Sequence, residues 1–110
     1  MASFRNAHCL LLAATACFSA SLSHAAASCV ENVTMAILHS NGNVYFTTDQ
    51  TCSTTWCQVD WGTAEKNKNA LAALLMAKMG DLSMEFYWPN IQACSDKNAV
   101  YSSPAYMMLK

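Results

Sequence analysis

Four cysteines in a short exported domain constrain the fold more than any other feature of this sequence. Two of the six cysteines in the 110-residue chain, Cys9 and Cys17, lie in an N-terminal segment with the properties of a secretory signal peptide. Cleavage after Ala27 leaves 83 of the 110 residues. A domain of that size buries a modest core, so covalent restraints are expected. An even number of cysteines in an exported chain predicts two disulfides; the four are Cys29, Cys52, Cys57 and Cys94.

The sequence does not choose among the three pairings that four cysteines allow. We favour Cys52 with Cys94, because both flank predicted strands and a long closed loop restrains the unfolded chain more strongly. The alternative is that one or more of the four are free buried thiols.

The N-terminal segment also predicts where the protein resides. Arg5 precedes an apolar stretch over residues 9–22, and residues 25–27 are small, as signal peptidase requires. The apolar stretch is shorter than the roughly 20 residues that a membrane-spanning helix needs. We therefore expect a secreted or periplasmic protein without a membrane span. Lipid attachment at Cys17 is the alternative, but Ala14 stands where such sites usually carry leucine, and Cys29 fits still less well.

The charge of the processed chain disfavours one class of partner. It contains five lysines, no arginine and seven acidic residues, which gives a net charge of −2. Nucleic-acid binding depends on clustered lysine and arginine that displace counterions from phosphates. We therefore expect no nucleic-acid partner.

The first half of the processed chain predicts three strands. β-Rich runs at about 30–39 and 43–48 flank Asn41 and Gly42, a pair that favours a hairpin with positive φ at both central positions. Alternation places Val44 and Phe46 on one face of the second strand. A third strand is expected within residues 54–60.

The second half predicts a helix that leads directly into a strand. Thr63 is a suitable N-cap for a helix over residues 64–79, and Leu71, Leu74 and Leu75 are expected to face the core. Gly80 is expected to end the helix in the left-handed conformation. Alternating residues over 82–88 predict a half-buried strand, and two further strands are expected at 99–102 and near the C-terminus.

This order, three strands, a helix and three strands, predicts a single domain over residues 28–110. It is the plan of a small mainly β Greek-key barrel of the oligonucleotide/oligosaccharide-binding (OB) kind, in which a helix lies between the third and fourth strands. The alternative is an open antiparallel sheet with one packed helix.

The segments "NGNVYF" and "ALAALLMAKMGDLSMEFYW", followed by Cys94, resemble small exported bacterial proteins. More distantly, the chain resembles the B subunits of pertussis-like and subtilase-cytotoxin-like toxins. That resemblance implies a disulfide-stapled OB-fold barrel that assembles as a ring of five and binds cell-surface glycans. It matches no glycan-contacting residue position by position.

The sequence offers few groups for catalysis or metal binding. His39 is the one histidine that remains after processing, and it lies beside the predicted hairpin turn. One histidine and oxidised cysteines are too few ligands for zinc, and no serine lies in a nucleophile motif such as G-x-S-x-G. We therefore expect no catalytic residue, no metal and no cofactor.

The aromatic residues are the better candidates for ligand binding. Tyr87 and Glu85 share the outer face of one predicted strand, where they could offer a ring and a hydrogen-bond acceptor, and Trp61 is a third candidate. Two hypotheses follow. The first is a non-enzymatic binding module for a glycan or an exported protein, in a homo-oligomer joined through the strand near the C-terminus. The second is a structural or accessory periplasmic protein.

Overall fold

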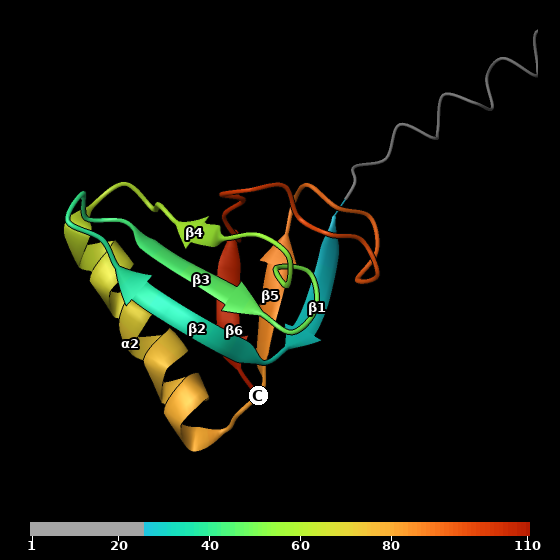
Figure 1. Ribbon diagram of the computed structural model, residues 1–110, viewed down its shortest axis with the longest axis horizontal. Helices are drawn as coiled ribbons and strands as arrows, with labels where there is room; N and C mark the ends of the chain where they lie inside the picture. Colours follow the sequence, from blue (N-terminus) through green and yellow to red (C-terminus); the bar gives the residue numbers. More distant parts are fainter. Residues whose placement is uncertain (1–25) are drawn as a thin grey trace, which may run out of the picture.

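The computed structural model describes residues 26–110, which form a mainly β fold with one helix (Figure 1). The predicted signal peptide, including Cys9 and Cys17, lies outside the described residues except for its last two. The elements are β1 (Ala27–Glu31), β2 (Val33–Leu38), β3 (Val44–Thr48), β4 (Cys57–Val59), α2 (Ala64–Gly80), β5 (Met84–Trp88) and β6 (Tyr106–Leu109).

The strands form two antiparallel sheets rather than the closed barrel that the sequence led us to expect. One sheet has the order β1-β5-β6 and the other β2-β3-β4. In Figure 1 β2 and β3 run obliquely to β1, β5 and β6, and α2 lies on the side away from β1. Four strands precede the helix and two follow it, so the predicted arrangement of three and three is wrong.

A barrel would close if β4 paired with β6, and the segment between Ala99 and Pro104 prevents this. The strand predicted at 99–102 is a turn, in which Tyr101 has a φ of +66°. One backbone hydrogen bond, from Gln58 N–H to Ser102 O, joins this segment to β4. Pro104 has no N–H to add to a ladder, so pairing resumes only at Tyr106.

The strand predicted at 30–39 is divided at Asn32, where the chain passes from one sheet to the other. The Asn32 backbone N–H and side-chain amide donate to the two carboxylate oxygens of Asp49, at 2.9 and 3.0 Å. The Asp49 N–H donates in return to Asn32 O. These bonds occupy the backbone N–H and C=O of Asn32, which a continuous strand would use to pair with its neighbour. The strand therefore turns at this residue.

The β2–β3 hairpin is present, but its turn differs from the predicted one. His39 N–H donates to Asn43 O, and Gly42 N–H donates to His39 O. Only Gly42 of the central pair has positive φ, at +90°. The loop is therefore a three-residue turn with a glycine bulge, in place of a two-residue turn at Asn41 and Gly42.

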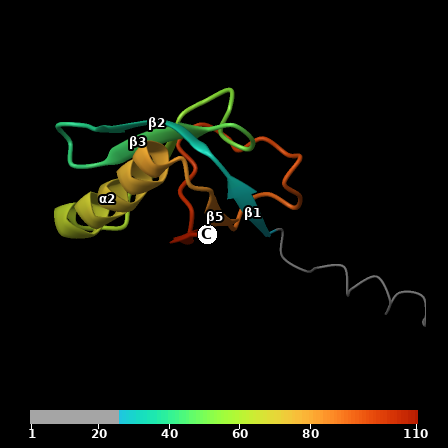
Figure 2. The same ribbon diagram turned by 90° about the horizontal axis from the view of Figure 1, so that it is seen from below.

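Helix α2 covers one face of the β2-β3-β4 sheet (Figure 2). Thr63 caps its start, as predicted, by accepting a hydrogen bond from Lys66 N–H. The buried residues are Asn67, Ala70, Leu74 and Ala77, so two alanines let the helix approach the strands closely. Of the leucines expected in the core, Leu74 is buried, Leu71 is half-buried and Leu75 is exposed.

The end of α2 also departs from the prediction. Gly80 is the last helical residue, and the left-handed residue is Asp81, with φ 55° and ψ 45°. Leu82 N–H then donates to Ala77 O at 2.8 Å, which satisfies a carbonyl of the last turn. The chain therefore needs three residues between the helix and β5.

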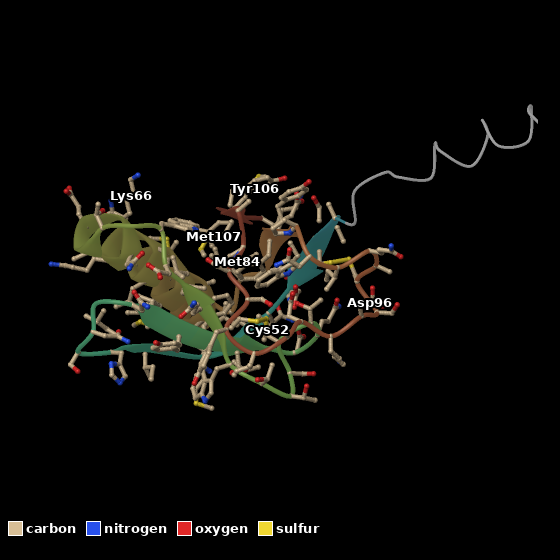
Figure 3. The ribbon with its side chains drawn as sticks, turned by 90° about the horizontal axis from the view of Figure 1, so that it is seen from above. Cys52, Lys66, Met84, Asp96, Tyr106 and Met107 are labelled. Carbon is tan, nitrogen blue, oxygen red and sulfur yellow. A yellow bond between two sulfur atoms is a disulfide. The ribbon has the colours of Figure 1, made fainter. Side chains whose placement is uncertain are left out.

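Aromatic side chains from both sheets stack within the core. Phe46 of β3 stacks on Phe86 of β5 with 5.4 Å between ring centroids, and Phe86 stacks on Trp88 at 5.5 Å. All three are fully buried. Met84 and Met107 also point inward, whereas Tyr106 lies on the outer side of its sheet (Figure 3).

A buried carboxylate joins the two sheets at one point. Glu31, which is 1% exposed, accepts hydrogen bonds from the hydroxyls of Thr48 and Thr51, from Thr51 N–H and from Trp88 Nε1–H. We call these four residues the Glu31 cluster. All the donors are neutral, so hydrogen bonds rather than a counter-ion compensate for burial of the carboxylate.

All four cysteines are paired, as predicted, but the favoured Cys52–Cys94 pairing is wrong. The disulfides join Cys29 to Cys94 and Cys52 to Cys57, with sequence separations of 65 and 5. Loop-closure entropy assigns the longer bond about 4 kcal/mol and the shorter one about 2 kcal/mol. Cys29–Cys94 satisfies the preference for a long loop, whereas Cys52, in the turn that follows β3, is joined to Cys57 at the start of β4.

Replacing the carboxylate of Glu31 by an amide is expected to destabilise the fold. In Glu31→Gln the amide NH2 group must face either Thr51 N–H or Trp88 Nε1–H. Either orientation therefore places two hydrogen-bond donors against each other. We expect the free energy of unfolding in urea to fall by about 2–4 kcal/mol. Glu85→Gln, which removes the half-exposed ion pair with Lys110, is the matched control and should cost less than about 1 kcal/mol. Equal losses in the two variants would contradict this role for Glu31.

Candidate functional site

Four aromatic or heteroaromatic residues and one isoleucine line a surface pocket of about 210 Å³. We call it the aromatic pocket; its lining residues are Ile37, His39, Tyr45, Trp56 and Tyr101. The volume is below the roughly 300–1,000 Å³ typical of pockets for drug-sized ligands. It suits a group the size of one ring.

The aromatic pocket lies on the face of the β2-β3-β4 sheet that α2 leaves open. Ile37 pairs with Tyr45 across the β2–β3 ladder, so their side chains share one face. The neighbouring residues Val44 and Phe46 point to the opposite, buried face, as the alternation predicted. The helix and the pocket therefore occupy opposite sides of this sheet.

The hairpin turn orients two of the pocket side chains. The Asn41 backbone N–H donates to His39 Nδ1 at 3.1 Å, and its side-chain amide donates to Tyr45 Oη at 3.0 Å. The rings of His39 and Tyr45 meet edge to face, with centroids 5.7 Å apart. With Nδ1 acting as an acceptor, a neutral His39 carries its proton on Nε2.

The other two aromatic residues come from loops that are tied to each other. Trp56 belongs to the short loop that the Cys52–Cys57 disulfide closes. Tyr101 N–H donates to Trp56 O at 2.7 Å, and the Tyr101 ring packs against Tyr45 with 5.4 Å between centroids. Three separate chain segments therefore converge on the pocket.

The Glu31 cluster reaches both of these loops through Thr51. Thr51 immediately precedes Cys52, where the Trp56 loop begins. Its carbonyl accepts from Asn98 N–H at 2.8 Å, and its hydroxyl accepts from the Asn98 side-chain amide at 2.9 Å. Asn98 lies three residues before Tyr101, so the buried carboxylate helps to position both loop aromatics.

Tyr101 adopts a backbone conformation that tyrosine rarely takes. Its φ of +66° lies in the left-handed region, yet the side chain is 52% exposed. Strained residues of this kind cluster at binding and catalytic sites, where surrounding structure holds them in place. Burial in the core does not explain why a tyrosine stands here.

The chemistry of the aromatic pocket favours a neutral ligand with an apolar face and acceptor oxygens. The lining residues include neither a carboxylate nor a lysine or arginine. The rings of Tyr45, Trp56 and Tyr101 offer apolar surface, and the imidazole, phenol and indole groups offer N–H and O–H donors. Trp56 Nε1 makes no hydrogen bond to residues 26–110, which leaves it free to donate to a ligand.

The ligand-binding residues predicted from the sequence, Tyr87, Glu85 and Trp61, are not among the residues that line the aromatic pocket. Tyr87 and Glu85 do share the outer face of β5, where Tyr87 stacks on Tyr106 and Glu85 pairs with Lys110 at 3.2 Å. Trp61 is half-buried and donates from Nε1 to Pro104 O at 2.9 Å. Each of these side chains already has a partner within the fold.

A second hollow, of about 250 Å³, lies between the hairpin tip and the start of α2. Its buried member, Asn67, donates to Gly42 O and accepts from Trp61 N–H. These bonds satisfy the amide within the fold, so the hollow joins the hairpin to the helix. Within residues 26–110, no group of three potential metal ligands comes together, and no helix of that range is long and apolar enough to cross a membrane.

Comparison with known proteins adds no relative to this picture. No protein-family model matches the chain, and searches of curated proteins and of solved structures also find no match. Function is therefore inferred from the geometry of the chain itself.

Replacing Tyr101 separates a binding role from a structural one. Tyr101→Gly removes the strained left-handed tyrosine, so we expect the free energy of unfolding to stay unchanged or to rise by up to about 1 kcal/mol. Asp81 is the other non-glycine residue of positive φ within residues 26–110. The free energy of unfolding of Asp81→Gly should change in the same way, so this variant is the matched control. Thermal unfolding of the two variants tests this. A loss of more than about 2 kcal/mol in Tyr101→Gly alone would assign Tyr101 a structural role.

Proposed function

We propose that the protein is an exported, non-enzymatic binding module that holds a sugar ring in the aromatic pocket. One observation carries the proposal: three segments far apart in sequence bring Tyr45, Trp56 and Tyr101 together at the surface, with Tyr101 in a strained conformation. A sugar presents an apolar C–H face to aromatic rings and oxygen atoms to hydrogen-bond donors. Both requirements agree with the lining of the pocket.

The same residues support binding rather than catalysis. The lining residues include no serine, cysteine or carboxylate that could act as a nucleophile or as an acid–base pair. The Nδ1 atom of His39 already accepts from Asn41 N–H, which leaves the imidazole as a donor toward the pocket. A binding module requires nothing further, whereas an accessory protein without a ligand would give no reason for the strain at Tyr101.

The strand pairing supports an OB-like origin for the fold. The chain from Ala27 to Leu38 passes through both sheets with one bend, and α2 lies between β4 and β5. The OB fold is a partly open barrel with oligosaccharide-binding members. This topology agrees with the resemblance to toxin B subunits. The proposal therefore includes an exported location and glycan recognition.

A glycan array followed by titration calorimetry tests the proposal. We expect the protein to bind at least one class of immobilised oligosaccharide, and Trp56→Ala and Tyr101→Ala each to weaken binding about tenfold or more. The reason is that an aromatic contact contributes about 1.5 kcal/mol, and 1.4 kcal/mol corresponds to tenfold.

Trp61→Phe and Tyr87→Ala are the matched controls, because they change aromatic residues outside the aromatic pocket. They should bind like the parent protein. If the control variants lost binding and the pocket variants kept it, the sugar site would lie at Trp61 and Tyr87, which were predicted from the sequence. Absence of binding to every glycan would reject the sugar-binding proposal.

A further inference from the structure

Asn41, in the turn between β2 and β3, determines how the hydroxyl of Tyr45 can hydrogen-bond. The side-chain amide of Asn41 has one orientation, because Asn43 N–H donates to Asn41 Oδ1 at 2.9 Å. A backbone N–H can only donate, so Asn41 Oδ1 faces Asn43 and the donor Nδ2 faces Tyr45 Oη, 3.0 Å away. The Tyr45 oxygen accepts this bond, and its hydroxyl proton must therefore be donated elsewhere.

The backbone of Asn41 acts on His39 in the same way. Asn41 N–H donates to His39 Nδ1 at 3.1 Å, so the neutral imidazole carries its proton on Nε2. Within residues 26–110, neither the Tyr45 hydroxyl proton nor His39 Nε2–H has an acceptor. Both side chains line the aromatic pocket and both are bonded to Asn41. The pocket therefore has two free donors at the end near the hairpin turn, which we call its hairpin end.

The rest of the lining offers apolar surface and one acceptor. Ile37 pairs with Tyr45 across the β2–β3 ladder and is 43% exposed, so a ligand can still cover it. Trp56 and Tyr101 add the faces of two rings. Tyr101 Oη makes no hydrogen bond to residues 26–110 and remains able to accept one.

We propose, on the basis of the sugar-binding function proposed above, that the ligand is an N-acetylated amino sugar whose acetamido group binds at the hairpin end. The carbonyl oxygen of that group has two lone pairs and no proton, so it can accept from both Tyr45 Oη–H and His39 Nε2–H. Its methyl group covers apolar surface at Ile37 and the rings. Its N–H requires an acceptor, which Tyr101 Oη or water provides.

A plain hydroxyl group suits the hairpin end less well. A sugar hydroxyl accepts hydrogen bonds but also carries a proton, which needs an acceptor of its own when water is excluded. The acceptor nitrogen of His39 is already used by Asn41 N–H, and Tyr45 Oη already accepts from Asn41 Nδ2. A carbonyl oxygen makes no such demand.

A carboxylate also lacks a proton, but its charge disfavours it here. The buried carboxylate of Glu31 is held by four neutral donors, whereas the hairpin end offers two. The lining residues include no lysine or arginine, and the processed chain has a net charge of −2. An anionic sugar would therefore enter against the charge of the protein without a counter-ion.

Titration with matched pairs of monosaccharides tests the proposal. The Trp56 indole signal of the protein, purified after expression of the complete chain, reports binding of N-acetylglucosamine, N-acetylgalactosamine and N-acetylmannosamine, and of glucose, galactose and mannose. We expect at least one acetamido sugar to bind tenfold or more tightly than its parent hexose, because the parent lacks both the carbonyl oxygen and the methyl group.

Two results of this titration would overturn the proposal. One is equal affinity within all three pairs, and the other is tighter binding of glucuronic acid than of every acetamido sugar. In either case the pocket would still bind a sugar, so the function proposed above would stand. Binding of no sugar in the titration or on the glycan array would reject both.

Two variants test the role of Asn41 as a positioning residue. In Asn41→Asp, a carboxylate oxygen replaces Nδ2 and accepts the Tyr45 hydroxyl proton, which is then lost to the ligand. We expect this change and Tyr45→Phe each to lower the preference for the acetamido sugar about fivefold. The double variant should lose no more than either single one, because both changes remove the same donor.

Asn69→Asp is the matched control, because it makes the same chemical change at an exposed position on α2. Its preference for the acetamido sugar should equal that of the parent protein. Both sugars of a pair are neutral, so the added charge of either aspartate acts on them alike. Unchanged preference in Asn41→Asp, or additive losses in the double variant, would contradict the positioning role and overturn the assignment of the hairpin end.

Discussion

The fold depends on a buried carboxylate, that of Glu31, which pairs with no lysine, arginine or histidine of residues 26–110. Glu31 ends β1 at the point where the chain leaves one sheet for the other, and its oxygens accept from Thr48, Thr51 and Trp88. These donors come from β3 of the second sheet, from the turn between β3 and β4, and from β5 of the first sheet. An unpaired carboxylate in this position would cost several kcal/mol, so each donor is held in place by the others. Through Thr51 and Asn98 the same cluster also helps to position the two loops that bear Trp56 and Tyr101.

Local sequence signals predicted the individual elements better than their assembly. The hairpin, the helix with its Thr63 cap and the alternation of β5 were all visible in the sequence, because each depends on neighbouring residues. Two disulfides were expected from the even number of cysteines, but their pairing was not. The bend at Asn32 was not, since its cause is Asp49, 17 residues away. The closed barrel failed for a similar reason. Whether β4 reaches β6 depends on the turn around Tyr101, whose conformation no local pattern indicated.

The candidate site was the least predictable part. The alternation of Val44 and Phe46 implies that Tyr45 lies on the opposite face of β3, as it does, but no sequence pattern pointed to Trp56 or Tyr101. Their convergence results from one backbone hydrogen bond and from the Cys52–Cys57 loop, which are contacts between segments that the sequence does not relate. The first candidates, Tyr87 and Trp61, were chosen by side-chain type. In the fold both side chains are engaged by neighbours.

The indole region of a ¹⁵N–¹H correlation spectrum tests the central claim, that one buried cluster supports the fold while a separate aromatic pocket binds sugar. The chain has three tryptophans. We predict slow solvent exchange for the Trp88 indole N–H, which donates to Glu31. When a sugar that binds is added, we predict that the indole chemical shift changes for Trp56 alone. Trp61, bonded to Pro104, should stay unmoved. Fast exchange at Trp88, or a sugar-induced shift at Trp61 with none at Trp56, would contradict the account.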